Sequence, residues 1–143
     1  MTGGETVHAT CVAIGGRGIL LFGSSGTGKS DLALRLIDRG AVLVSDDYTL
    51  LDSASGRVLA GAPTTIRGRI EVRGIGIVES SAEADVPVCL AAELDRAVER
   101  LPEGPMTRIV AGAEIPAVAI SALEASAPIK LELALQLFGL PPP

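Results

Sequence analysis

The sequence predicts an α/β fold, because a strand, a glycine-rich loop, a helix and a second strand follow one another directly. Residues 19–22 (ILLF) form an apolar run that leads into GSSGTGKS at residues 23–30. Residues 31–39 carry leucine and isoleucine at helical spacing, and Gly40 stands where a helix ends. The apolar run at residues 41–44 has the length of a buried strand.

The elements around this unit are predicted to be strands. Residues 7–14 are mostly apolar and β-branched, and the glycine-rich turn at residues 15–18 joins them to the next strand as a hairpin. Residues 66–77 (IRGRIEVRGIGI) alternate with a two-residue period, which predicts a strand whose glycines mark a bend or a close approach. One face of that strand, the arginine face, would carry Arg67, Arg69, Glu71 and Arg73.

The C-terminal half gives weaker signals. Residues 86–90, 108–113 and 117–120 are predicted strands. Residues 101–105 (LPEGP) are predicted to be a loop. Residues 129–138 predict a helix, which ends at a glycine followed by three prolines.

Composition fits one globular domain, residues 1–143, and argues against several classes of protein. Hydrophobic residues make up 48% but aromatic residues only 2%, so Ala, Val, Ile and Leu must fill the core. The net charge of −5 argues against a nucleic-acid partner. No apolar run approaches the ~18–20 residues of a membrane span, and no secretory signal is visible, so we expect a cytoplasmic protein without membrane association. Cys11 and Cys89 are expected to be buried or idle reduced thiols.

The GSSGTGKS stretch matches the Walker A pattern of a phosphate-binding loop. Its glycines let backbone N–H groups converge on an anion, and the following helix presents its N-terminal donors to the same phosphates. Lys29 is expected to reach the β- and γ-phosphates of ATP, and Ser30 to bind Mg²⁺. The alternative is a Gly/Ser turn without a ligand, but the preceding strand and following helix are the context that the motif requires. The expected nucleotide-binding residues are Gly23, Ser24, Ser25, Gly26, Thr27, Gly28, Lys29 and Ser30.

An acidic pair, Asp46 and Asp47, follows the strand at 41–44. This position predicts that the pair lies near the γ-phosphate, where one carboxylate faces the metal and the other accepts a proton from a nucleophile. The alternative is a solvated pair that caps the next turn. Two adjacent carboxylates need cations nearby, and Lys29, Mg²⁺ and the arginine face are available for that role. Otherwise the arginine face is a solvated strand edge.

The single histidine, His8, lies in the predicted strand before the hairpin. A lone histidine is more often a structural hydrogen-bonding residue than a catalyst. Both interpretations stay open on the residues alone.

Several motifs occur in a specific order along the chain. They are VHATCVAI with His8, the loop GSSGTGKS with the helix DLALRLIDRG, the strand end LVSDD, and above all IEVRGIGIV at residues 70–78. VERLPE around Arg100 and RIVAGAEIPAVAI follow as a weaker match. With these motifs the chain resembles the catalytic domain of bacterial HPr kinase/phosphorylase, firmly over residues 7–79 and loosely from residue 86 to about residue 120.

The resemblance implies a P-loop kinase core akin to phosphoenolpyruvate carboxykinase, with a strand-rich mixed sheet and few helices. It also implies an ATP- and Mg²⁺-dependent protein-serine kinase that phosphorylates HPr, a small phosphocarrier protein of sugar phosphotransferase regulation. Asp46 would be the base that takes the serine proton. The implied residues are catalytic His8, Lys29, Asp46 and Arg100, and the Mg²⁺ ligands Ser30 and Glu71, with Asp47 as a further candidate ligand.

The chain departs from the family pattern in two places. Full-length members carry a separate N-terminal domain, whereas this chain begins almost at the catalytic one. The family's Pro- and Arg-containing loop, linked to removal of the phosphate, corresponds here to AISALEASAPIK at residues 119–130, which has no arginine. The expectation is therefore a kinase with reduced or no phosphorylase activity. The number of subunits is left open, a homo-oligomer included.

Two other classes of function remain open on the sequence. One is a kinase for a small metabolite or an ATPase, which would act without a carrier protein. The other is a nucleotide-sensing module without strong catalysis that regulates a signalling partner.

Overall fold

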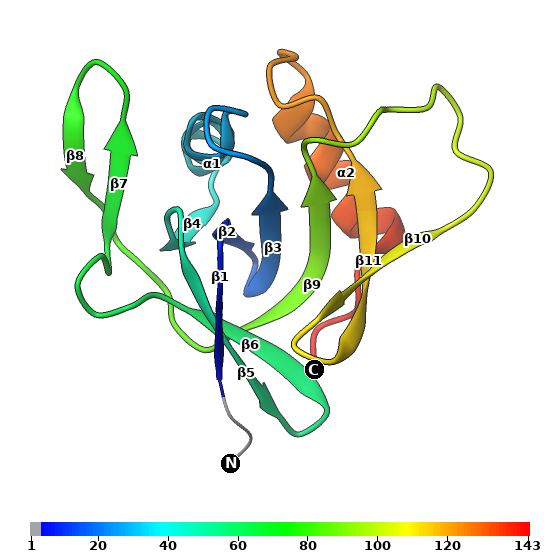
Figure 1. Cartoon of the computed structure of the whole chain (residues 1–143), viewed down its shortest axis with the longest axis horizontal. Helices are drawn as coiled ribbons and strands as arrows, with labels where there is room; N and C mark the ends of the chain where they lie inside the picture. Colours follow the sequence, from blue (N-terminus) through cyan, green and yellow to red (C-terminus); the bar gives the residue numbers. More distant parts are fainter. Residues whose placement is uncertain (1–3) are drawn as a thin grey trace.

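The computed structural model describes residues 4–143, and this part of the chain forms one strongly bent sheet, a separate hairpin and two helices (Figure 1). The sheet runs in the order β1-β5-β6-β9-β3-β2-β4, and β11 and β10 continue from β9. The strands are β1 (Glu5–Val7), β2 (Ala9–Ile14), β3 (Arg17–Phe22), β4 (Val42–Ser45), β5 (Thr49–Ala54), β6 (Arg57–Gly61), β7 (Arg69–Val72), β8 (Gly76–Glu79), β9 (Val86–Glu93), β10 (Met106–Val110) and β11 (Ala113–Ala119), and the helices are α1 (Lys29–Asp38) and α2 (Ala127–Phe138).

Strand direction brings several loops to one edge of this sheet. β3 and β11 both run parallel to β9, and β2 runs antiparallel to β3 and to β4. The carboxyl ends of β4, β3, β9 and β11 therefore meet at the same edge, together with the amino end of β2. Ligands of open α/β sheets bind at such an edge.

The hairpin before the glycine-rich loop forms as the sequence predicts. Gly15 and Gly16 have φ values of 57° and 78°, the left-handed pair that a two-residue hairpin turn requires. The strand predicted at 7–14 is divided, however. His8 lies in a bend between β1 and β2, because β1 pairs with β5 while β2 pairs with β3 and β4.

Both helices confirm the sequence prediction. α1 begins after Gly28, whose φ of 97° turns the chain out of the loop and into the helix. Its apolar stripe buries Leu32 and Leu36 against the sheet. α2 spans residues 127–138 and packs beside α1 and β9.

The strand predicted at residues 66–77 is wrong as one element. β7 and β8 form an antiparallel hairpin around Gly74, whose φ is 86°. The glycines thus mark a reversal of the chain. Arg67 and Arg73 lie in turns outside β7, so the predicted arginine face is not one strand face.

Two further features differ from the prediction. The strand expected at residues 108–113 ends early, because Ala111 and Gly112 (φ of 49° and 81°) reverse the chain between β10 and β11. The β5–β6 hairpin was not predicted, although Ser55 and Gly56, with φ of 51° and 76°, form its turn. A Ser-Gly pair between apolar runs is a usable hairpin signal.

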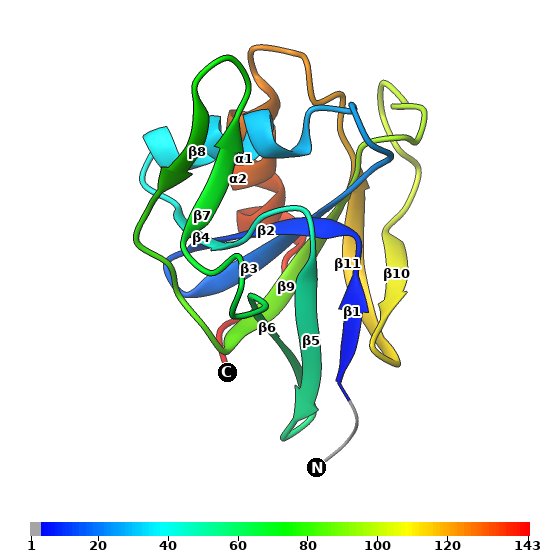
Figure 2. The ribbon, with the colours of Figure 1, turned by 60° about the vertical axis from the view of Figure 1, so that its left-hand side comes forward.

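The core lies on both faces of the central strands. Ile19 and Leu21 face α1 and α2, whereas Leu20 faces the layer that β5, β6 and β11 complete. Figures 1 and 2 place the helices and the β7–β8 hairpin at one end of the molecule and the β5–β6 hairpin at the other.

Cys11 and Cys89 are free and buried, as expected. Neither helix in residues 4–143 is long and apolar enough to cross a membrane.

Candidate functional site

A cavity of about 410 Å³ opens at the edge where the co-directional strands end. The glycine-rich loop and the first turns of α1 line it together with the acidic pair after β4 and the adjacent strand β7, whose Glu71 N–H donates to Asp46. The lining residues are Ser25, Gly26, Gly28, Lys29, Ser30, Asp31, Leu34, Asp46, Asp47, Glu71, Val72, Arg73 and Leu123.

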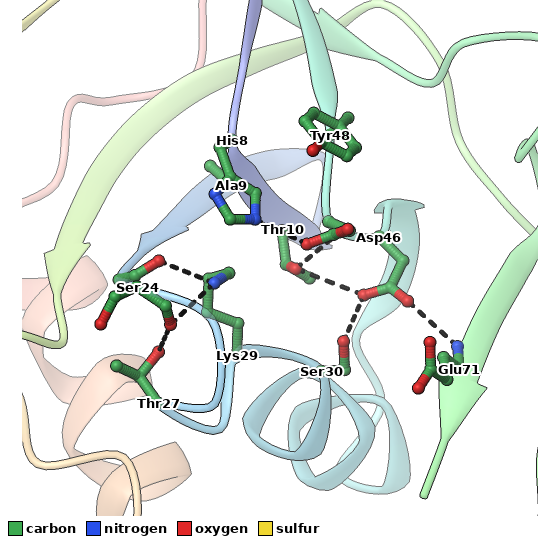
Figure 3. Close-up of polar contacts among 12 residues, drawn as sticks. His8, Ala9, Thr10, Ser24, Thr27, Lys29, Ser30, Asp46, Tyr48 and Glu71 are labelled. Atoms are coloured by element: carbon green, nitrogen blue, oxygen red, sulfur yellow. Dashed lines mark hydrogen bonds and ion pairs between the residues drawn. The ribbon is translucent and has the colours of Figure 1, made fainter.

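The loop has the geometry of an anion cradle. Gly26 and Gly28 both have positive φ, of 86° and 97°, and a Cβ on Gly23 would lie 2.5 Å from Thr27 Oγ1. Lys29 is only 6% exposed, and its Nζ donates to the Gly23 carbonyl at 2.7 Å and to the Ser24 carbonyl at 3.2 Å. The lysine ammonium is therefore already held over the loop (Figure 3).

A carboxylate at the end of β9 fixes the start of the loop. Asp95 accepts hydrogen bonds from the Ser24 backbone N–H (2.7 Å) and from Ser24 Oγ (3.1 Å). No local pattern predicts this pairing, because 71 positions separate the two residues.

Asp46 is the most enclosed carboxylate of the site, at 7% exposure. Its Oδ1 accepts from Ser30 Oγ at 2.6 Å and from Thr10 Oγ1 at 3.3 Å, and its Oδ2 accepts from the Glu71 backbone N–H at 3.0 Å. Figure 3 shows this carboxylate between β2, α1 and β7. Asp46 thus links three elements and has donors on both oxygens.

Asp47 has a different environment. Its φ of 68° is a left-handed conformation that Asp tolerates better than most residues, and it turns the side chain out of the line of β4. The Asp47 N–H donates to Thr10 Oγ1 (3.0 Å), and the Tyr48 N–H donates to the Asp46 carbonyl (2.7 Å), which stabilises the turn. The Asp47 side chain remains 55% exposed.

His8 pairs with this open carboxylate. Its Nε2 lies 2.8 Å from Asp47 Oδ1, and its ring stacks on Tyr48 with centroids 5.1 Å apart. Thr10 and Tyr48 were not singled out by sequence reasoning. The usable signals were position alone: Tyr48 is the only tyrosine and directly follows the acidic pair, and Thr10 lies two residues after His8.

The oxygen atoms near Ser30 are suitable ligands for Mg²⁺. This ion commonly takes one or two protein oxygens and completes its shell with phosphates and water. Ser30 Oγ and the Asp46 carboxylate are in contact, and Glu71 lines the same cavity. Residues 4–143 hold no cluster of three or more His, Cys, Asp or Glu side chains arranged as a metal cage.

Of the predicted site residues that do not line the cavity, Gly23, Ser24 and Thr27 belong to the glycine-rich loop and His8 pairs with Asp47, whereas the remaining one is Arg100. It is exposed on the segment between β9 and β10, which Figure 1 shows as a long loop directed away from β7 and β8. Of the predicted arginine face, only Glu71 and Arg73 line the cavity. The other predicted residues, His8 among them, gather around the glycine-rich loop and the acidic pair.

Comparison with known proteins identifies the family. The family profile described as HPr Serine kinase C-terminal domain matches residues 1–128. The chain belongs to this family. An HPr kinase/phosphorylase of Caldicellulosiruptor bescii is 48% identical over 75 residues, which cover 52% of this chain and 24% of that protein. The HPr kinase/phosphorylase of Lactiplantibacillus plantarum is 33% identical over 129 residues, which cover 81% of this chain and 41% of that protein.

A solved structure of a related protein shows that the similarity includes the fold. The Hpr(Ser) kinase/phosphatase from Coxiella burnetii superposes with a TM-score of 0.81 and 27% identity, over 92% of this chain and 88% of that chain. The predicted family and the strand-rich α/β fold are confirmed. The named relatives are kinases, so this is a family of phosphotransferases. This chain spans between a quarter and two fifths of the length of the two curated relatives.

Proposed function

We propose that this domain transfers the γ-phosphoryl group of ATP to a serine hydroxyl of an HPr-like phosphocarrier protein, with Mg²⁺. The observation that carries the proposal is the joining of the phosphate loop to two differently placed carboxylates in one cavity. Asp46 contacts Ser30 of the loop, and Asp47 contacts His8 at the open side. The names of the relatives supply the carrier and the serine.

The loop and Lys29 are the nucleotide-binding part of this proposal. Backbone N–H groups of residues 25–30 and the amino end of α1 receive the phosphates, and Lys29 neutralises charge on the transferring group. Ser30, Asp46 and Glu71 would hold Mg²⁺, which supplies positive charge to the phosphate oxygens. Phosphoryl transfer depends mainly on positioning and on this charge neutralisation.

The geometry supports Asp47, in place of Asp46, as the base. Both oxygens of Asp46 already accept hydrogen bonds from protein donors, and the side chain is almost fully enclosed. Asp47 is half exposed, so an incoming serine can approach it, and His8 orients its carboxylate. In this arrangement Asp47 accepts the serine proton, and His8 stabilises the resulting charge distribution.

Two further parts of the proposal concern Arg100 and the reverse reaction. Arg100 would contribute charge to the transition state only after its segment moves toward the cavity. Reduced or absent phosphorylase activity rests on the segment at residues 119–130, which has no arginine. Both concern the later half of the chain, where the motifs match more loosely.

The test is a transfer assay with labelled ATP, Mg²⁺ and the HPr-like carrier of the same cell. We expect label on one serine of the carrier, and none when that serine is replaced by alanine. Asp47→Asn should abolish transfer with ATP binding retained, whereas Asp38→Asn, an exposed carboxylate at the end of α1, should leave the rate unchanged. ATP binding without any transfer would refute the kinase and support a sensing module. Carrier-independent turnover would support a metabolite kinase or ATPase.

A further inference from the structure

One exposed leucine lies directly against the phosphate loop. Leu123, in the segment between β11 and α2, is 82% exposed and lines the cavity. A Cβ placed on Gly28 would be 3.5 Å from Leu123 Cδ2, so the leucine side chain lies beside the glycine that precedes Lys29. Most of this apolar side chain is therefore in contact with solvent.

The position of Leu123 is fixed by an arginine of α1. Arg35 donates from Nη1 to the Glu124 carbonyl at 3.0 Å and from Nη2 to the Ala122 carbonyl, so it holds the residues on both sides of Leu123. Asp31 accepts from Arg35 Nε at 3.0 Å and orients the guanidinium. The segment is therefore held in a geometry that keeps the leucine side chain in water.

Leu34 completes an apolar wall beside the loop. It lies on the exposed side of α1 and lines the same cavity as Leu123. The acidic pair belongs to the β4 side of the loop, whereas Leu123 follows β11 on the β9 side. The first side thus carries the acidic pair, whereas the second carries the exposed hydrocarbon of Leu123 beside the carboxylate of Asp31. Leu34 lies one helical turn after Ser30 on the same face of α1.

The position of the phosphates indicates which side of the cavity receives the nucleoside. Lys29 and Ser30 receive the β- and γ-phosphates, so the α-phosphate and the nucleoside leave the loop past the first turn of α1. That turn carries Asp31 and leads to Leu34. A nucleobase is a flat, largely apolar group that gains free energy from contact with such a wall.

We propose that Leu123, together with Leu34, forms the contact surface for the nucleoside of the bound nucleotide. The proposal rests on the proposed function, because it requires a nucleotide at the loop. Arg35 is a positioning residue in this arrangement, since it acts through the backbone of the segment at residues 122–124. The wall contributes affinity for the base and ribose and none for the phosphates.

The experiment compares binding of MgATP with binding of magnesium tripolyphosphate, which has the phosphates but no nucleoside. Leu123→Ala should raise the Kd for MgATP about five- to tenfold and leave the Kd for tripolyphosphate unchanged. Leu137→Ala is the matched control, because Leu137 is 70% exposed near the end of α2 and does not line the cavity. Arg35→Gln should weaken MgATP binding in the same selective way.

Several results would overturn the proposal. An unchanged Kd for MgATP in Leu123→Ala would remove the leucine from the nucleoside contact, and a raised KM for the carrier in that variant would assign it to the protein substrate. Equal weakening of MgATP and tripolyphosphate would make Leu123 a support for the loop. Failure of the parent protein to bind MgATP would refute nucleotide binding itself, and with it both proposals. Normal MgATP binding with no phosphoryl transfer would leave the nucleoside contact standing and refute only the kinase.

Discussion

The two adjacent carboxylates should differ sharply when each is replaced by its amide. Asp46→Asn can keep its oxygen on the Glu71 N–H and turn its NH₂ group toward Ser30 Oγ and Thr10 Oγ1, because these hydroxyls can accept as well as donate. The three hydrogen bonds then lose the carboxylate charge in an enclosed position, and hydrogen bonds to a charged group are roughly twice as strong as neutral ones. We expect a loss of about 2–3 kcal/mol in the free energy of unfolding.

This loss converts to a measurable change in thermal stability. A chain of this size loses about 3 °C in Tm per kcal/mol, so Asp46→Asn should unfold about 6–9 °C below the parent protein. Asp47→Asn removes only a half-exposed charge from its pair with His8, worth about 0–1 kcal/mol, and Asn tolerates the left-handed φ of this position. Its Tm should fall by less than about 3 °C.

The assay is thermal unfolding followed by circular dichroism, with the phosphoryl-transfer rate measured on the same samples. Asp47→Asn should be stable and inactive, whereas Asp46→Asn should be destabilised. Equal Tm values for the two variants would refute the view that Asp46 is the structural link of the site. Full transfer activity in Asp47→Asn would refute its role as the base.

Three other predictions follow from contacts elsewhere in the fold. Gly23→Ala would force a methyl group against Thr27 and Leu94, so we expect at least about a tenfold rise in the Kd for MgATP by calorimetry; unchanged affinity would mean that the loop adjusts freely. Arg17→Ala removes hydrogen bonds to the carbonyls of Leu135 and Leu140, so limited chymotrypsin digestion should cut faster at Phe138, and an unaltered cleavage rate would contradict this anchoring role. Burial, followed by the nearby Cys89, raises the pKa of the Cys11 thiol. Because the folded state keeps this proton, its contribution to stability should be constant below pH 9.0, the ordinary thiol value, and be lost as the pH rises above it. Urea unfolding of the parent and of Cys11→Ala across pH 8–10.5 would reveal the difference, and identical slopes would exclude it.

Local signals predicted the first third of the chain well. The Gly15–Gly16 turn, the loop at residues 23–30 and α1 depend on residues that are close in sequence, so periodicity and glycine position suffice. The same reasoning correctly predicted that the acidic pair lies near the loop, since β4 follows α1 directly.

The remaining features depend on long-range pairing. β9 pairs with β6, β3 and β11 along its length, and the residue pattern of β9 itself does not predict three partner strands. The different roles of Asp46 and Asp47 arise from Thr10, 36 and 37 positions away, and from the backbone of Glu71. Two identical side chains next to each other in sequence look equivalent until the elements around them are assembled.

The anchor between Ser24 and Asp95 limits where Arg100 can travel. Arg100 lies five positions after Asp95, and an extended chain spans about 3.4 Å per residue, so the two Cα atoms can be no more than about 17 Å apart. The guanidinium is therefore carried by a short segment that is hydrogen-bonded to the phosphate loop. Moving it over the cavity would require torsional changes in a few exposed residues and no rearrangement of any strand.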